Sequence, residues 1–409
     1  ASAPALTTFG MTGVDPNLVV ARSYQYSFSI QRELPAGTLL QVSYVGTQGR
    51  HILRGPTVND PSWTPQNYLP VSPNPNNLAC PAGINTAAFH CTNGFGPGTG
   101  TKAGITGDQT RPFLGYGGVN MELSDEDSNY NALQVGLTKR AGMLTASVAY
   151  TYSKAMGTGG GAGEGLGLNP ESECPFTCLV STAANPVLIN GGTTATVGGT
   201  QTGGVVENWK KFYYGKLSYD ATNVLAISFT VESPWGKSKT GFEGALVKGW
   251  SLSAITHYQS GGPVTATGSV NEGLTGISIG RRAQIVPGQP LRFQVGQPCL
   301  AANGTSKAAA ICWFNPNAFT LASTLGAGDA PINNLINPNF YTWDLTARKT
   351  VVLPWREGLS FQIEGDAFNA FNRANWSGAG TGNAGSITFG QITGSLPARV
   401  LQLGAKINF

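Results

Sequence analysis

Apolar and polar side chains alternate along the final segment of the chain, residues 397–409. Successive side chains of a strand point to opposite faces. The apolar face would carry Leu401, Leu403, Ala405, Ile407 and Phe409, and the opposite face Gln402, Gly404, Lys406 and Asn408. A strand of about 10 residues with one apolar and one polar face is what a transmembrane β-barrel requires. A half-buried strand of a soluble sandwich has the same pattern, so this segment alone leaves two architectures open.

The same alternation recurs throughout the chain and predicts about nine strands. The predicted strands are residues 23–30, 40–47, 133–138, 144–153, 213–232, 250–259, 341–351, 359–367 and 397–409. The longest, 213–232, exceeds the roughly 9 to 11 residues that cross a bilayer, so it is expected to project beyond the membrane.

Short and long connections alternate along the chain. Short turns are predicted at 35–37, 140–142 and 354–358, with a somewhat longer one at 235–249; long loops are predicted at about 55–127, 155–211, 268–339 and 373–396. All long loops therefore lie at one end of the sheet. Outer-membrane barrels have short periplasmic turns and long extracellular loops, whereas a sandwich has no reason to segregate them. This asymmetry favours an antiparallel transmembrane β-barrel in a bacterial outer membrane, in contact with its lipid.

Composition agrees with a membrane barrel. Charged residues make up 11% of the 409 residues, against roughly 25% in ordinary soluble proteins. No apolar run reaches the about 18 residues of a helical span. The net charge of +4 comes without a basic run, so nucleic acid is not a predicted partner.

An odd number of strands has a further consequence. A closed barrel from a single bacterial chain has an even number of strands, and each unpaired backbone group at an open edge costs several kcal/mol in lipid. We therefore expect residues 1–409 to form the carboxy-terminal segment of a larger barrel, with an amino-terminal part supplying an odd number of further strands.

Six cysteines occur as three close pairs, each within a predicted long loop: Cys80 and Cys91, Cys174 and Cys178, and Cys299 and Cys312. An even count in local pairs favours disulfides in an oxidising compartment. A zinc site is the alternative, but only His90 lies beside a cysteine, and no CxxC motif is present. No metal or cofactor is predicted.

Several charged residues fall on the predicted polar face, which would line the lumen: Asp220, Glu232, Asp344, Arg348, Glu364 and Asp366. Paired carboxylates can act as general acid and base, but a water-filled or plugged interior also requires charge. We expect Asp344 and Arg348 to belong to an internal ionic network. The three histidines are widely spread and suggest no catalytic triad, so no enzyme is predicted.

Aromatic residues accompany the loop cysteines. Phe89, His90, Trp313 and Phe314 could form a ligand-binding surface, because loops on a rigid scaffold commonly carry recognition. The alternative is that they pack each loop against its neighbour.

Three blocks resemble a known family: SYQYSFSIQRELPAGTLLQVSYVGTQGRH at 23–51, GWSLSAITHYQSGGPVT at 249–265 and EGDAFNAFNRANW at 364–376. They are similar to the carboxy-terminal barrel of TonB-dependent receptors of the Oar-like kind. The resemblance implies a barrel of roughly 22 or more strands, occluded by a plug and driven by an inner-membrane energy-coupling complex. The final strand also resembles that of bacterial outer-membrane proteins, which implies that Phe409 is an assembly signal.

The chain departs from this family in what it lacks: a regulatory domain, a plug and a coupling box. The resemblance therefore implies a transporter's channel wall and ligand-facing loops. Two alternatives are a structural or adhesive surface protein with disulfide-stapled loops and a passive porin.

Overall fold

The computed structural model describes a long, twisted β-sheet and part of the loops that connect its strands. The described residues are 9–55, 116–158, 177–182, 184, 188–189, 201–202, 205–234, 239, 241–271, 278–293, 311–320, 327–353, 358–378, 382 and 384–409. No described helix is long and apolar enough to cross a membrane.

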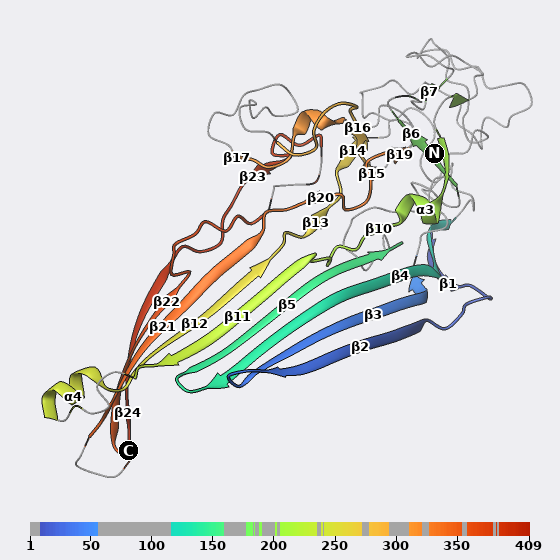
Figure 1. Ribbon diagram of the computed structural model, residues 1–409. Coiled ribbons are helices and arrows are strands. Elements are labelled where there is room, and N and C mark those ends of the chain that lie inside the picture. Colours follow the sequence, from blue (N-terminus) through green and yellow to red (C-terminus); the bar gives the residue numbers. More distant parts are fainter. Residues whose placement is uncertain are drawn as a thin grey trace, which may run out of the picture.

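Nine long strands form one antiparallel sheet in which each strand pairs with the next along the chain (Figure 1). They are β2 (Arg22–Leu34), β3 (Thr38–Arg54), β4 (Tyr116–Ala141), β5 (Leu144–Gly157), β11 (Asn223–Glu232), β12 (Trp250–Gln259), β21 (Phe340–Val352), β22 (Ser360–Phe368) and β24 (Val400–Asn408). This confirms the predicted all-β, antiparallel fold and its nine strands. The short strand β1 (Phe9–Val14), which was not predicted, adds to β4 in parallel.

The register keeps apolar side chains beside apolar ones across the sheet. Val42 pairs with Val135, which pairs with Tyr150, and Tyr150 pairs with Leu225. The neighbouring row on the opposite face is polar, as in the pairing of Ser43 with Gln134 and of Gln134 with Thr151. A slip of one residue would invert a whole strand, so this agreement between rows produces one apolar and one polar face.

The strands are joined by tight turns at one end of the sheet and by long connections at the other (Figure 1). At the first tight turn, Ala36 and Gly37 both have positive φ, 62° and 63°. Such left-handed conformations match the twist of a hairpin and are readily adopted by glycine. The turn between β11 and β12 differs because it contains the short helix α4 (Gly241–Val247).

The predicted strand 213–232 is wrong in its first half. Residues up to Tyr213 form the helix α3 (Trp209–Tyr213), β10 (Gly215–Lys216) follows, and β11 begins only at Asn223. A turn closes where the Asp220 amide donates to the Leu217 carbonyl, and the Asp220 carboxylate accepts from the Ala155 amide at 2.7 Å. These bonds hold the intervening residues in a turn, so β11 has 10 residues, the length of a single crossing.

A second correction concerns the first long loop. β4 begins at Tyr116, inside the segment 55–127 predicted as loop. Its loop-side part pairs with β3 through two irregularities in register, near Ile52 and Arg54. Such bulges bend a strand and increase its twist.

The long-loop end carries short paired strands. They are β13 (Pro263–Val264) with β20 (Leu335–Ile336), β14 (Thr267–Asn271) with β15 (Ser278–Arg282), β16 (Gln284–Ile285) with β18 (Phe319–Thr320), β17 (Ile311–Cys312) with β23 (Gln391–Ile392), β7 (Leu188–Ile189) with β8 (Gln201–Thr202), and β6 (Thr177–Ser181) between β9 (Val205–Asn208) and β19 (Ala327–Gly328); η3 (Pro316–Ala318) is a single 3-10 turn. We call the described residues of 263–293, 311–320, 327–336 and 384–392 the loop module.

The face assignment yields a test with two adjacent residues of β5. Val148 pairs with Leu137 and Ile227 on the apolar face, and Ala149 lies on the opposite face. We expect Val148→Arg to lower the free energy of unfolding by about 2–4 kcal/mol if it lies near the bilayer midplane. The measurement is chemical denaturation of the intact protein in lipid vesicles. Ala149→Arg is the control, and an equal loss in both variants would contradict the assignment.

Candidate functional site

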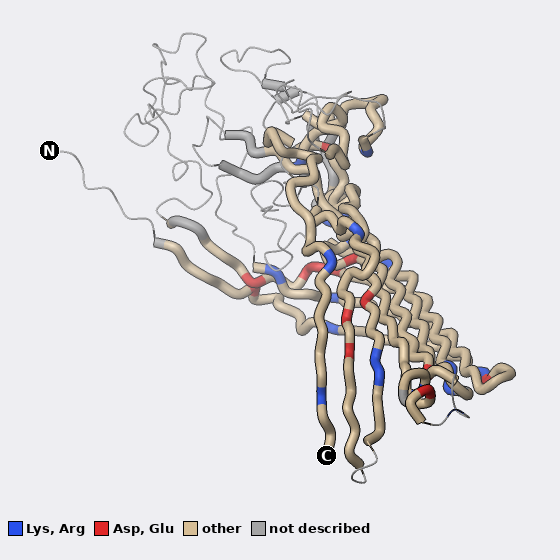
Figure 2. The backbone as a smooth tube through the Cα atoms, turned by 90° about the vertical axis from the view of Figure 1, so that its left-hand side faces the viewer, with Lys and Arg blue, Asp and Glu red and all other residues tan. Residues whose placement is uncertain are grey.

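Charged residues lie along the carboxy-terminal strands β21, β22 and β24 (Figure 2). Arg348 on β21 donates through Nε to Glu364 Oε2 on β22 at 2.6 Å. Through consecutive register pairs, Glu232 lies beside Ser251, Ser251 beside Arg348, and Arg348 beside Glu364. These strands therefore carry one transverse row of charges, in which the cation of Arg348 lies between carboxylates.

The other carboxylates of the polar face hold local polar groups. Asp366 Oδ1 accepts from Thr346 Oγ1 at 2.7 Å. Asp344 Oδ1 accepts from the Asn369 amide at 2.8 Å and from Thr342 Oγ1 at 3.2 Å. Asp344 and Arg348 thus share a face, but in the described contacts they belong to two separate groups. Their predicted role in a lumen network stays a prediction.

Asp220 departs from the predicted lumen set. Its carboxylate is only 3% exposed and forms an ion pair with Lys216 at 3.3 Å. Because it lies in the turn before β11, the prediction that placed it on the polar face of a strand is wrong. A buried acceptor satisfied by an amide and an ammonium stabilises local structure, and Asp220 does so at the loop-side end of β5.

A second charged cluster lies at the loop-side ends of β3 and β4. Arg54 forms a bidentate ion pair with Asp125, with Nε–Oδ1 at 2.5 Å and Nη2–Oδ2 at 2.9 Å. Asp127 interacts with Lys210 at 3.3 Å and with Arg50 at 3.8 Å. Sequence reasoning missed this cluster because 55–127 was assigned to a loop, although the run of acidic residues from Asp125 to Asp127 was visible.

The loop module has a hydrophobic core of its own. Phe319 and Phe389 meet edge to face with ring centroids 5.5 Å apart, and Phe314 is 2% exposed. Trp313 packs against this core and donates through Nε1 to the Ile336 carbonyl at 2.7 Å. Phe314 is therefore a packing residue, while Phe89 and His90 lie outside the described residues.

The module is attached to the wall beneath it. Asn333 is fully buried, donates through Nδ2 to the Lys216 carbonyl at 2.7 Å, and donates through its backbone amide to Thr265 Oγ1 at 2.9 Å. A side chain at Gly215 would come within 2.8 Å of Ile332. This close contact fixes the module over the loop-side end of the sheet, as Figure 1 shows.

Of the six cysteines predicted to form disulfides, two lie within the described residues. Cys178 lies in β6 and Cys312 in β17, no described cysteine is free, and Cys312 is disulfide-bonded. The remaining four, Cys80, Cys91, Cys174 and Cys299, lie outside the described residues. The three pairings therefore stay predictions. Phe409 follows β24 and is 88% exposed, and its role as an assembly signal likewise stays a prediction.

The geometry described above, an antiparallel wall with one apolar face and long loops at one end, agrees with a sequence comparison. The profile of a family described as an outer membrane beta barrel domain matches residues 1–176 and 188–402. The chain belongs to this family. It is an outer-membrane β-barrel protein, so its apolar face meets bacterial outer-membrane lipid and its polar face lines the barrel interior.

Solved structures of outer-membrane transporters are similar to this barrel protein at low identity. The outer membrane transporter YddB from Escherichia coli has 7% identity and a TM-score of 0.41, over 96% of this chain and 33% of that one. The FrpB iron transporter from Neisseria meningitidis has 11% identity and a TM-score of 0.36, over 96% and 32%. The chain thus spans about a third of their length. A search of curated protein sequences finds no match.

The loop module should unfold separately from the barrel wall. We expect Phe319→Ala to destabilise the module by about 3–5 kcal/mol, because it leaves a cavity beside Phe389. Hydrogen exchange of the intact protein should accelerate at 283–293 and 314–320 while β5 and β11 stay protected. Ile387→Ala, at a side chain 53% exposed in the same module, should leave the rates unchanged. Accelerated exchange in β11 would instead mean that the wall depends on the module.

Proposed function

We propose that this barrel protein is the carboxy-terminal part of the wall of a TonB-dependent, Oar-like receptor that transports a solute across the outer membrane. An amino-terminal part of the same barrel would supply the remaining strands and a plug. An inner-membrane energy-coupling complex would act through that part. The channel wall and the ligand-facing loops would be the contribution of residues 1–409.

The observation that carries this proposal is the pair of open edges. Within the described sheet, β2 pairs only with β3 and β24 only with β22. Every residue of β2 except Leu34 is exposed, and every residue of β24 except Asn408. Hydrocarbon cannot satisfy the outer backbone groups of these strands. In this proposal further strands of the amino-terminal part cover both edges, and the complete barrel of about 22 strands encloses a lumen wide enough for a plug.

The charges of the polar face support an interior in contact with water or with a polar domain. The row that contains Glu232, Arg348 and Glu364 runs from the turn-side end of β11, where Glu232 is the last residue, to the middle of β22. Arg348 and Glu364 keep 44% and 32% of their side-chain surface exposed, so both can make further polar contacts. A plug with a polar surface would meet these groups.

The loop module favours a second candidate, a surface protein that uses the barrel as an anchor and displays its loops. Its hydrophobic core and its attachment through Asn333 give it a fixed surface. In the transport proposal the same surface would bind solute. The two candidates differ in whether the interior contains a plug that couples to the inner membrane.

Ion conductance in planar bilayers tests for the plug. The sample is the intact particle, that is, residues 1–409 together with the amino-terminal part of the barrel as isolated from the outer membrane. We expect little conductance in buffer and a large, reversible increase in urea. A plug is stabilised by removal of apolar surface from water, which urea weakens, so it should unfold before the wall, whose hydrogen-bonded strands lie in lipid. Open channels without urea would support a passive porin and contradict the proposal.

Cross-linking in living cells tests the energy coupling. We expect the particle to cross-link through its periplasmic face to the coupling protein, and the amino-terminal part to carry the linked residues. A plugged barrel without this cross-link would favour the surface-display candidate.

A further inference from the structure

The helix α4 is an unusual feature of the tight-turn end of the wall. It interrupts the connection between β11 and β12, on the side that faces the periplasm in this family. Its Phe242 is 85% exposed and its Leu246 is 62% exposed. Figure 1 shows that α4 stands off the end of the sheet rather than continuing it. Neither side chain is covered by the described protein, so each needs a partner in the membrane interface.

Lys349 fixes this helix to the wall. The residue lies on the apolar face of β21, between Ala347 and Val351, and pairs in register with Trp250 and Ile363. Its Nζ donates to the carbonyl oxygens of Leu246, at 3.0 Å, and of Lys248. Carbonyl groups at the end of a helix lack partners within the helix. The ammonium supplies those partners, and the carbonyls in turn shield a charge that would otherwise face hydrocarbon.

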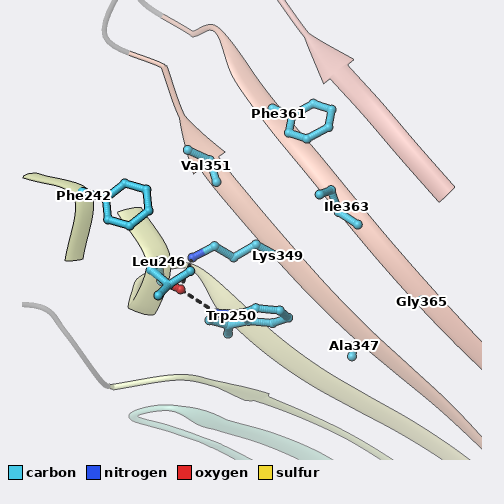
Figure 3. Close-up of a pocket in the computed structure, with 9 residues that line it drawn as sticks. All are labelled: Phe242, Leu246, Trp250, Ala347, Lys349, Val351, Phe361, Ile363 and Gly365. Carbon is cyan, nitrogen blue, oxygen red and sulfur yellow. Dashed lines mark hydrogen bonds between the residues drawn. The ribbon is translucent and has the colours of Figure 1, made fainter. Parts of the chain in front are cut away.

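Trp250 completes the attachment. Its Nε1 donates to the same Leu246 carbonyl at 3.0 Å, and Lys349 Nζ lies 5.4 Å from the centre of its ring. Cations are attracted to the face of an indole at this distance. Figure 3 shows Lys349 and Trp250 converging on Leu246 from two neighbouring strands.

An apolar groove of about 500 Å³ lies between α4 and the wall (Figure 3). Its sides are formed by Phe242, Leu246, Trp250, Val351, Phe361 and Ile363. Its floor contains the small residues Ala347 and Gly365. The volume falls within the roughly 300–1,000 Å³ of small-molecule sites, and the lining is almost wholly hydrocarbon.

We infer that this groove holds an acyl chain of a glycerophospholipid from the periplasmic leaflet, clamped against the wall by α4. The groove opens on the apolar face of the wall and is continuous with the surface that meets lipid, so its surroundings supply hydrocarbon chains. The described residues around α4 include Lys239 and Lys248 against the single acid Glu243, which pairs with Lys239 at 3.2 Å and leaves a net positive charge. Basic residues at the membrane surface attract anionic headgroups, which favours phosphatidylglycerol over a neutral lipid. This inference rests on the outer-membrane location and not on transport.

Photolabelling tests the site directly. The intact protein is reconstituted in phosphatidylethanolamine vesicles that contain a small fraction of phosphatidylglycerol with a diazirine on one acyl chain. After photolysis, we expect peptides covering 242–250 and 347–351 to carry more adducts per residue than the lipid-facing strand β11. Adducts spread evenly over the wall would overturn the inference. Adducts in the groove from a diazirine fatty acid, with none from the phospholipid, would overturn the glycerophospholipid as occupant.

Filling the groove provides the matched comparison. Ala347→Leu combined with Gly365→Leu should reduce groove labelling to the level of β11; a Cβ at Gly365 meets only Leu403, at 3.5 Å, so the strand accepts it. Ala146→Leu, on the apolar face of β5, should leave the enrichment intact. Heat-modifiable migration on gels confirms that each variant is folded. Undiminished groove labelling in the filled variant would overturn the inference.

The clamp is tested through Lys349. In Lys349→Met we expect the α4 amides to exchange about tenfold faster, equivalent to about 1.4 kcal/mol, and the groove labelling to be lost. Lys349→Arg, which keeps a cation, should restore most of both. The control is Lys139→Met, which removes a lysine from the same face on β4. Unchanged α4 exchange and labelling in Lys349→Met would show that the helix does not clamp a lipid.

Discussion

Backbone pairing in hydrocarbon is the constraint on which the rest of this structure depends. No water is available there to bind a free N–H or C=O group, so the backbone groups of each strand must form hydrogen bonds with those of its neighbours. The simplest solution is a meander, and β2 to β24 form one without a crossover. Once the strands are paired in register, the apolar side chains of all strands lie on one face of the sheet and the polar side chains on the other. Lipid then meets one face and the barrel interior the other.

This constraint separates two sources of stability within the chain. The wall has few buried side chains, because its apolar residues face outward. The hydrophobic core of the described residues lies instead in the loop module, around Phe314, Phe319 and Phe389. There the driving force is removal of apolar surface from water. The module can therefore have a fixed shape at the membrane surface while the wall below it is held by lipid and by its ladder of hydrogen bonds.

The sequence predicted what is local and missed what depends on distant partners. Period-two alternation found nine strands because lipid on one side imposes it on each strand separately. It failed at 213–222 because the bond that ends the alternation comes from the Ala155 amide to Asp220, far away in the chain. It also failed at the loop-side part of β4, where polar residues such as Ser128 and Asn129 occupy both faces. The polar face was predictable, but the pairing of Arg348 with Glu364 was not, because it depends on the register of two strands.

The exceptions to the alternation show where the wall contacts something other than bulk hydrocarbon. Thr256 occupies an apolar position, is 2% exposed, and satisfies its hydroxyl at the Thr342 carbonyl of the neighbouring strand, at 2.7 Å. A hydroxyl has one donor, so a carbonyl within the sheet suffices. The ammonium of Lys349 has three donors and a full charge, and a sheet whose carbonyls are already paired cannot satisfy it. Helix α4 has unpaired carbonyls to offer, so it satisfies this lysine, and its position beside the wall creates the groove.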